Sequence, residues 1–295
     1  MRLVTFSDAS GSRIGVHDAA TDEIVDLAAS TRLPRDMTAF IALGKNGLKR
    51  AREAVKSGKG RLPAAGVTLL APIPRPARNI LCVGKNYYDH AREFHNSGFD
   101  ASAGKDAIPE LPIIFTKWPN SVIANHEPIP SHLDYTSSTD YEGELTVVIG
   151  AGGRGIPKAR AFDHVYGYTI INDATARTLQ NTHKQWFLGK SLDGYCPMGP
   201  CIVTADEVPD VTQLRLLTKV NGEVRQDALV SQLIFDIPTL IETLSRVMTL
   251  EPGDLLATGT CAGVGIGFNP PKFLKSGDRV EITIEPIGTL ENPVE

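Results

Sequence analysis

DYEGELTVVIG, which runs from Asp140 to Gly150, is the stretch that decides how this chain is organised. It opens with acidic residues and continues as an apolar run, which is typical of a buried strand. Side chains two residues apart on a strand point to the same face. If Tyr141–Ile149 is a strand, Glu142 and Glu144 therefore share one face, and Gly143 leaves space between them.

A second stretch, YGYTIIND, is aromatic and β-branched, so it also predicts a strand, and it ends at Asp173. Three carboxylates on neighbouring strand ends would repel one another unless a cation lay among them. Oxygen ligands suit a hard divalent ion, Mg²⁺ first, with Mn²⁺ or Ca²⁺ as alternatives. The other interpretation is that Glu142 and Glu144 form a solvated strand edge that discourages aggregation. Spacing alone leaves both interpretations open.

Composition places the chain among ordinary globular proteins. Of its 295 residues, 42% are hydrophobic and 22% are charged, and the net charge is −4. This balance argues against nucleic acid and against an anionic membrane as partners. No apolar run is long enough to span a bilayer and no signal-peptide pattern opens the sequence, so we expect a cytoplasmic protein. Four cysteines lack metal-site spacing and are expected to be reduced and mostly buried: Cys82, Cys196, Cys201 and Cys261.

A proline-rich stretch divides the chain, so we expect a small α+β domain over residues 1–72 and a larger domain over residues 73–295. Strands dominate the end of the larger domain, where Asn221–Gly222 predicts a type I′ hairpin turn. In the small domain the patterns predict three strands and two helices, the helices being separated by Gly44–Gly47: Leu3–Phe6, Arg13–Val16, Ile24–Leu27, Asp36–Leu43 and Leu48–Val55.

A helix is predicted over Tyr87–Asn96. On this helix His90 and Glu93 are three residues apart and therefore lie on one face. A histidine beside a carboxylate can act as a general base, although an exposed helical ion pair is the commoner reason for this spacing. The segment Ser97–Leu111 lacks periodicity, and together with the helix it is a plausible lid.

GAGGRG, Gly150–Gly155, matches the G-x-G-x-x-G pattern of dinucleotide-binding folds and lies 18 residues before Asp173. We do not favour this interpretation, because the helix predicted after it, about Pro157–Val165, is short. A first Rossmann strand is also buried on both faces and rarely begins with two glutamates. A dinucleotide site stays open as the less favoured reading of this motif.

Further polar residues stand at positions where they can reach a ligand. Arg177 and Gln180 are three apart on a predicted helix and face the same way. Lys190 is expected in a loop flanked by glycines. The loop GTCAGVGIG, which begins at Gly259, could bring N–H groups and the Thr260 hydroxyl to an anionic ligand, or it could simply be a surface loop.

These motifs, in this order, resemble the fumarylacetoacetate hydrolase family. The resemblance extends from about residue 78 to residue 290 and rests on six stretches: GKNYYDHAREF, DYEGELTVVIG, NDATAR, GKSLDGYCPMGP, KVNGEVRQ and TGTCAGVG. It implies an α+β fold that is mostly β, the family's mixed β-sandwich roll, and usually a homodimer. Residues 1–70 resemble the small N-terminal domain that many bacterial members carry.

The resemblance also implies roles for individual residues. His90 and Glu93 match a lid dyad that activates water, and Lys190 matches a lysine that points at substrate and metal. Three acidic residues match the metal ligands of the family: Glu142, Glu144 and Asp173. Contacts with the substrate carboxylate or with metal-bound water are implied for three more residues: Arg177, Gln180 and Thr260.

The chain departs from the family pattern at two places near the expected pocket. Cys261 stands where proline usually follows Gly-Thr, and Trp118 separates Lys117 from Pro119 where the family often has Lys-Pro. Both changes could reshape the pocket. A thiolate at Cys261 could be oxidised, but we expect a small residue that fills the place of the usual proline.

We therefore expect a Mg²⁺-dependent hydrolase of aromatic-compound catabolism that cleaves a C–C bond in a small β-diketo acid of the acylpyruvate or fumarylpyruvate type. A metal would stabilise a developing enolate, while Glu93 and His90 deprotonate the attacking water. One alternative uses the same enolate for keto–enol tautomerisation or decarboxylation of an oxo acid such as oxaloacetate. A third interpretation, of another class, is a non-catalytic protein that binds a ligand or a dinucleotide.

Overall fold

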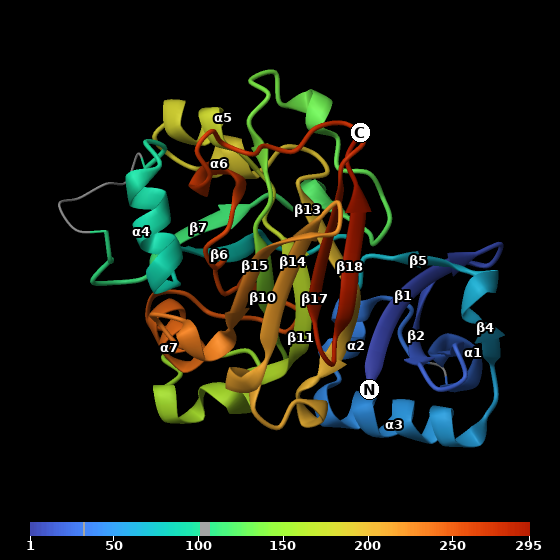
Figure 1. Ribbon diagram of the computed structural model, residues 1–295. Coiled ribbons are helices and arrows are strands. Elements are labelled where there is room, and N and C mark those ends of the chain that lie inside the picture. Colours follow the sequence, from blue (N-terminus) through green and yellow to red (C-terminus); the bar gives the residue numbers. More distant parts are fainter. Residues whose placement is uncertain (32, 101–106) are drawn as a thin grey trace.

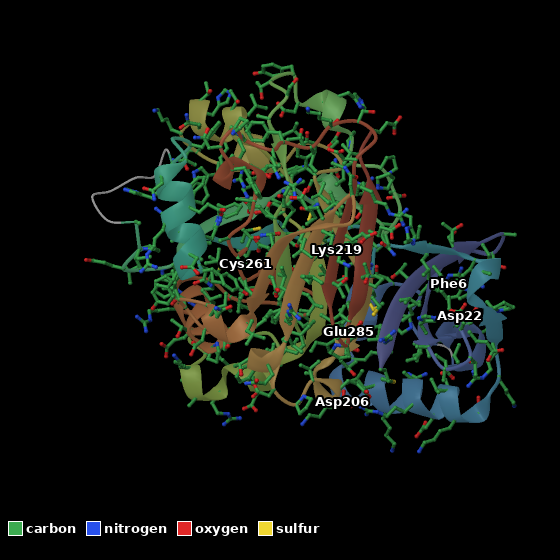
Figure 2. All side chains as sticks on the ribbon, in the orientation of Figure 1. Phe6, Asp22, Asp206, Lys219, Cys261 and Glu285 are labelled. Atoms are coloured by element: carbon green, nitrogen blue, oxygen red, sulfur yellow. The ribbon has the colours of Figure 1, made fainter. Side chains whose placement is uncertain are left out.

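The structure is a computed structural model that describes residues 1–31, 33–100 and 107–295 (Figure 1). A unit formed by the first 70 residues, drawn mostly in blue, lies at one side of a larger body. Helix α4, Tyr88–Asn96, lies at the opposite side of that body. Figure 2 accordingly shows Phe6 and Asp22 in the N-terminal unit and Cys261 in the larger body.

The N-terminal unit contains the three predicted strands, but its helices differ from the prediction. Helix α3 begins at Gly44, so Gly44–Gly47 is not a break between two helices. Gly47 instead allows close packing, because a Cβ there would lie 2.9 Å from the Cβ of Leu43 and 3.2 Å from the carbonyl oxygen of Phe40. The elements of the unit are β1 Arg2–Asp8, β2 Gly11–Asp18, β3 Glu23–Asp26, α1 Leu27–Thr31, α2 Met37–Ile41, α3 Gly44–Ser57, β4 Arg61–Pro63 and β5 Thr68–Leu70.

One large sheet runs through both parts of the molecule. Its strands from the larger body are β6 Ile80–Gly84, β7 Ile113–Lys117, β8 Val122–Ile123, β10 Gly143–Ile149, β11 Val165–Asn172, β13 Cys196–Thr204 and β16 Leu255–Ala257. The order is β4-β3-β2-β1-β13-β11-β10-β16-β6-β7, with β5 beside β1 and β8 beside β13. Because β1 pairs antiparallel with β13, the sheet crosses the predicted boundary near residue 72. The division into two domains stays a prediction.

A second sheet packs against the middle of the first. It has the order β15-β14-β17-β18, formed by β14 Arg215–Val220, β15 Glu223–Leu229, β17 Arg279–Ile284 and β18 Gly288–Pro293. Figure 1 shows these strands lying over β10 and β11, and apolar residues of both layers, such as Val147 and Ile282, belong to one core. Asn221 and Gly222 both have positive φ, as a type I′ turn requires. The mostly β, α+β class predicted from the sequence is confirmed.

The stretch Asp140–Gly150 contributes to two strands, and the predicted single strand over Tyr141–Ile149 is shorter than expected. Thr139–Asp140 is β9, which pairs with β12, Thr175–Ala176, and β10 begins only at Gly143. Glu142 therefore precedes the strand, because the side chain of Asn172 rather than a backbone partner accepts its N–H, at 2.9 Å. This two-strand arrangement brings the acidic residues to the end of the β10–β11 pair.

The α-helices among the described residues of the larger body are α4, α5 Arg177–Thr182, α6 Phe187–Lys190 and α7 Ile237–Val247. Within the described ranges, none of the helices has the length and hydropathy needed to cross a bilayer. Part of the predicted lid segment Ser97–Leu111, residues 101–106, lies outside the described residues. The glycine motif Gly150–Gly155 follows β10 and leads to a 3₁₀ helix, Lys158–His164, and β11 then pairs antiparallel with β10. A dinucleotide fold would need parallel strands here.

Candidate active site

Three acidic side chains converge where β10 begins and β11 ends. Glu142, Glu144 and Asp173 each offer a carboxylate oxygen, and these oxygens lie within 4.8 Å of one another. The antiparallel register places Gly143 opposite Asn172, and the N–H of Asp173 donates to the carbonyl of Glu142 at 2.8 Å. The convergence predicted from the spacing is therefore present in the fold.

The triad has the properties that a divalent cation requires. All three residues are buried, so the alternative of a solvated strand edge is wrong. Glu144 accepts a hydrogen bond from the N–H of Gly259 at 2.8 Å, and among the described residues it forms no ion pair. Burial first, and then the charges of Asp173 and Glu142, raise the pKa of Glu144 well above its usual range. A cation among hard oxygen donors would relieve this repulsion, so the residues fit a divalent metal.

Two buried lysines neutralise part of the acidic charge. Lys190 Nζ lies 2.7 Å from Glu142 Oε2 and 2.8 Å from Asp173 Oδ2. Burial tends to lower the pKa of Lys190, but the charges of Asp173 and Glu142 raise it overall. The predicted loop position of Lys190 is wrong, because it is the last residue of α6. The second lysine, Lys117, was not predicted as a site residue; its Nζ lies 2.7 Å from Asp173 Oδ1.

Arg177 and Gln180 share a face of α5, as predicted. Arg177 Nη1 donates to Gln180 Oε1 at 3.2 Å, and Nη2 lies 2.6 Å from Glu142 Oε1. Burial tends to raise the pKa of Glu142, but Lys190 and Arg177 lower it to about 2. Asp140 was not predicted as a site residue; its Oδ2 accepts a hydrogen bond from Arg177 Nε at 2.9 Å and fixes the guanidinium from its other side.

The predicted dyad is assembled on α4. His90 Nδ1 lies 3.0 Å from Glu93 Oε2, and Glu93 Oε1 accepts the N–H of Gly263 at 2.9 Å. His90 is buried and lines the same pocket as the acidic residues, so the alternative of an exposed helical ion pair is wrong for this residue. Glu93 thus connects α4 to the glycine-rich loop that follows Gly259.

That loop binds carboxylates of the protein itself. Three of its backbone N–H groups donate hydrogen bonds to carboxylates: that of Gly259 to Glu144, that of Gly263 to Glu93, and that of Gly265 to Asp140 at 2.6 Å. These N–H groups are therefore not available to an anionic ligand, which the sequence had left open, and the loop is not a free surface loop. Its role is to fix acidic groups of the site.

Thr260 lines the pocket, but its hydroxyl is already engaged. It donates to the carbonyl of Gly143 at 2.9 Å and accepts from Gln226 Nε2 at 2.7 Å. Gln226, which is fully buried on β15, also accepts the N–H of Gly143 at 3.0 Å. Gln226 thus holds the start of β10, and no spacing in the sequence pointed to it.

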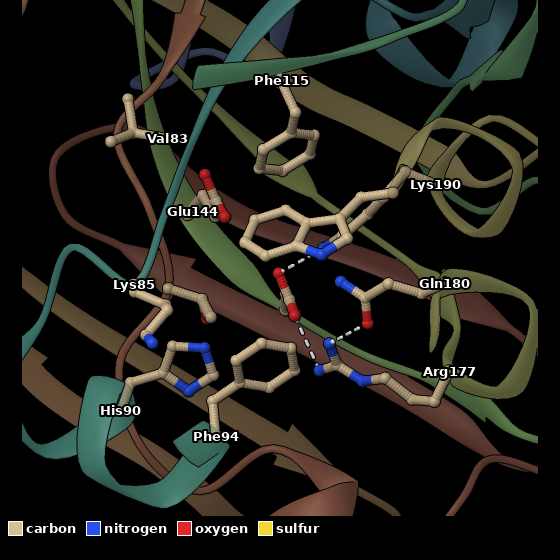
Figure 3. A pocket seen from close by; sticks show the side chains of 13 residues that line it. Val83, Lys85, His90, Phe94, Phe115, Glu144, Arg177, Gln180 and Lys190 are labelled. Carbon is tan, nitrogen blue, oxygen red and sulfur yellow. Dashed lines mark hydrogen bonds and ion pairs between the residues drawn. The ribbon is translucent and has the colours of Figure 1, made fainter. Parts of the chain in front are cut away.

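The pocket between these groups is narrow. About 10 Å³ is open to the centre of a water-sized sphere, which is room for about one water molecule. Figure 3 shows His90 and Lys85 on one side of the pocket and Arg177, Gln180 and Lys190 on the other. Aromatic residues, Phe94, Phe115 and Trp186 among them, complete its wall. The arrangement places a histidine, acidic groups and cationic groups around one small volume.

Cys261 follows Thr260 and is buried. Burial raises the pKa of its thiol to about 12, so the thiol stays protonated at neutral pH. This supports the expectation of a small packing residue over that of a redox centre.

Comparisons with known proteins all match this chain to one protein family. Residues 79–295 match the family model described as fumarylacetoacetate (FAA) hydrolase C-terminal. Oxaloacetate tautomerase YisK of Bacillus subtilis is 50% identical over 270 residues, which cover 89% of this chain and 87% of that protein.

Solved structures with the same overall fold include two hydrolases. A fumarylacetoacetate hydrolase from Exiguobacterium antarcticum is 41% identical with a TM-score of 0.83, covering 100% of this chain and 99% of that one. Maleylpyruvate hydrolase from Sphingobium sp. SYK-6, in complex with manganese(II) and pyruvate, is 32% identical with a TM-score of 0.79, covering 100% and 98%.

Proposed function

Because the chain belongs to the fumarylacetoacetate hydrolase family, we propose that it is a keto–enol tautomerase of a 2-oxo acid, with oxaloacetate as the best candidate substrate. One observation carries this proposal: His90, which is paired with Glu93, lines the same pocket as Glu142 and Glu144 of the acidic triad. The similarity to an oxaloacetate tautomerase favours this chemistry over the hydrolysis that we expected first from the sequence. Both reactions begin from an enolisable 2-oxo acid.

Mg²⁺ is the metal that we propose for Glu142, Glu144 and Asp173, with Mn²⁺ as the alternative, since a related structure contains manganese(II). When bound, such an ion supplies Lewis acidity that stabilises negative charge on the oxygen of a 2-oxo acid. The carboxylates hold the ion, and Lys190 and Lys117 keep Asp173 in place from two sides.

The chain's own residues handle the proton. Glu93 engages Nδ1 of His90, so Nε2 is the ring nitrogen left to take the proton from the carbon beside the oxo group. The same proton, or one from water, is then delivered to the oxygen, and no bond between carbon atoms breaks. Arg177 and Gln180 lie across the pocket, where they can orient the substrate carboxylate.

Hydrolysis of a C–C bond in an acylpyruvate is the second candidate function. It is favoured by the similarity to fumarylacetoacetate and maleylpyruvate hydrolases. In that case His90 would take its proton from water rather than from carbon. Hydrolysis differs from tautomerisation in that it needs a water molecule beside the bound substrate.

Product analysis separates the two reactions. The Mg²⁺-loaded protein is mixed with enol oxaloacetate and, separately, with acetylpyruvate and fumarylpyruvate, and the products are followed by ¹H NMR. Conversion of enol to keto oxaloacetate without new carboxylic acids is the expected result. Pyruvate and a carboxylic acid released from the acylpyruvates would move the assignment to the hydrolase, and no conversion of any of the three would contradict both.

A further inference from the structure

Lys85 is a buried cation of the pocket that the proposed function does not use. It follows β6 directly and has a φ of +55°, a region that a lysine seldom adopts. The next residue fixes this turn: Asn86 donates to the carbonyl of Thr258 at 2.8 Å and accepts the N–H of Phe235 at 2.8 Å. An unusual backbone conformation that is held this firmly suggests that the side chain is needed where it stands.

The position of Lys85 complements that of Arg177. Both line the pocket, but Figure 3 shows Lys85 beside His90, across the cavity from Arg177, Gln180 and Lys190. A ligand whose one end lies near Arg177 would therefore extend its other end toward Lys85. The cavity thus has cationic side chains at both ends.

Lys85 already holds a carboxylate. Its Nζ lies 2.8 Å from Oδ2 of Asp100, a residue from the segment after α4, and both side chains are at most 4% exposed. A buried lysine paired with a carboxylate has the geometry and the charge to accept a carboxylate from a ligand instead. A ligand carboxylate that replaces Asp100 beside Lys85 gives the lysine a new partner, so the buried ammonium group is not left uncompensated.

We propose that Lys85 is the specificity-determining residue that binds the second carboxylate of a dicarboxylic 2-oxo acid, and that Asp100 occupies this position until the ligand arrives. The inference rests on the proposed function and narrows its substrate class. Substrates with a carboxylate at each end are selected over those with an apolar end. Asp100 is an internal competitor in this scheme.

Oxaloacetate and pyruvate form a matched pair for the test, because they differ by one carboxylate group. Calorimetric titration of the full-length protein in Mg²⁺ gives the ratio of their dissociation constants. We expect Lys85→Gln to weaken oxaloacetate binding by roughly 10- to 100-fold relative to pyruvate, the range for a lost charged hydrogen bond. Lys85→Arg, which keeps the charge, should retain most of the preference for oxaloacetate.

Asp100→Asn separates this role from a purely structural ion pair. If Asp100 competes with the ligand, this variant should bind oxaloacetate more tightly, opposite in sign to Lys85→Gln. If the pair only holds the segment after α4 in place, both variants should change the affinity for both ligands in the same direction, which would overturn the proposal. Circular dichroism and the melting temperature check that each variant is folded.

The binding ratio is independent of turnover, so it also separates this inference from the proposed function. Wild-type protein that does not tautomerise oxaloacetate, yet prefers it to pyruvate through Lys85, would disprove the function and support the selectivity. Tautomerisation with a preference that Lys85→Gln leaves unchanged would support the function and disprove the selectivity. Wild-type protein that binds neither ligand would disprove the selectivity as well.

Discussion

His90 reaches the pocket with one ring nitrogen already engaged. Nδ1 lies 3.0 Å from Glu93 Oε2, and the carboxylate of Glu93 is itself held by the N–H of Gly263. The second bond orients the carboxylate, and the carboxylate orients the imidazole. Such a chain would keep the imidazole in one tautomer and one orientation, as the general-base role proposed for His90 requires.

Replacement of His90 tests this role directly. His90→Ala should lower the rate of enolisation by roughly 10²- to 10⁴-fold, because that is the usual worth of a positioned general base. The affinity for Mn²⁺, measured by electron paramagnetic resonance, should stay close to that of the wild type, since His90 is not one of the acidic ligands. Arg92→Ala is the matched control, because Arg92 lies on the exposed side of the same helix. Near-normal turnover in the His90→Ala variant would show that His90 is not the general base.

The cysteines should be inert in the folded protein. Burial raises the pKa of Cys196, Cys201 and Cys261 to about 12 and that of Cys82 well above its usual range. A raised pKa favours the protonated thiol, so at pH 8 only roughly one thiol in 10⁴ with a pKa of about 12 is the reactive thiolate. Iodoacetamide at pH 8 should leave the mass and the activity unchanged, and should modify all four residues in denaturant. Rapid alkylation of Cys261 with loss of activity would reverse this conclusion.

The glycine-rich loop is the element that connects the parts of the site. Its backbone N–H groups bind Glu144 of the triad, Glu93 of the dyad and Asp140, the partner of Arg177. Gly263 has a φ of +103°, and a Cβ there would lie 1.8 Å from the carbonyl oxygen of Arg225. The loop therefore needs glycine both for its backbone conformation and for its close approach to β15.

Gly267→Ala should inactivate the enzyme without unfolding it. An added Cβ would lie 1.9 Å from Glu93 Oε1, and this carboxylate can rotate away because it ends a flexible side chain. We expect a loss of activity comparable to that of Glu93→Gln, with a change in melting temperature of only a few degrees. Gly66→Ala is the control, because a Cβ at Gly66 meets nothing within 4 Å. Unchanged activity in Gly267→Ala would show that the position of Glu93 is not critical.

The sequence identifies candidate site residues that lie a few positions apart in the chain. It does not identify residues that reach the site only through tertiary contacts. Glu142 and Glu144 are two apart and His90 and Glu93 three apart, so spacing alone placed each pair on one face. Lys117 and Gln226 reach the site from distant strands through tertiary contacts, to Asp173 and to Thr260 respectively, and no local pattern marks such contacts. One sequence feature could have drawn attention to Lys117: this lysine ends the mostly apolar strand IIFTK.

The same limit applies to the elements. The strands of the N-terminal unit and the turn at Asn221–Gly222 follow from local pattern and turn chemistry. Strand β13, Cys196–Thr204, was not predicted, because it begins within a stretch rich in glycine and proline that reads as a loop. Its identity as a strand comes from its neighbours β1 and β11, which lie far away in the sequence.

At the scale of the whole molecule, the N-terminal unit and the larger body share a hydrophobic core. Leu3 and Ile14 belong to the same buried cluster as Ile80, Val148 and Ile202. The unit also covers one edge of β13 through β1. Assembly into a homodimer stays a prediction. Light scattering, which measures the molar mass in solution, tests it directly.

Removal of residues 1–72 should therefore destabilise the remainder. The fragment 73–295 would expose apolar residues of the shared core and the edge of β13, and exposed edge strands promote aggregation. We expect the fragment to aggregate or to melt well below the full chain, whereas the full chain should unfold in one calorimetric transition. A soluble fragment with the melting temperature of the full chain would show that the two parts fold independently.

The dependence of enolisation on the acidic triad tests the central claim most directly. The protein is stripped with EDTA, and the loss of the enol absorbance of oxaloacetate is followed by stopped flow before and after Mg²⁺ is added. We predict that Mg²⁺ restores rapid conversion to the wild type but not to Glu144→Gln, which keeps the shape of the side chain and loses a charged ligand. Conversion that is equally fast without metal, or in the Glu144→Gln variant, would contradict the account.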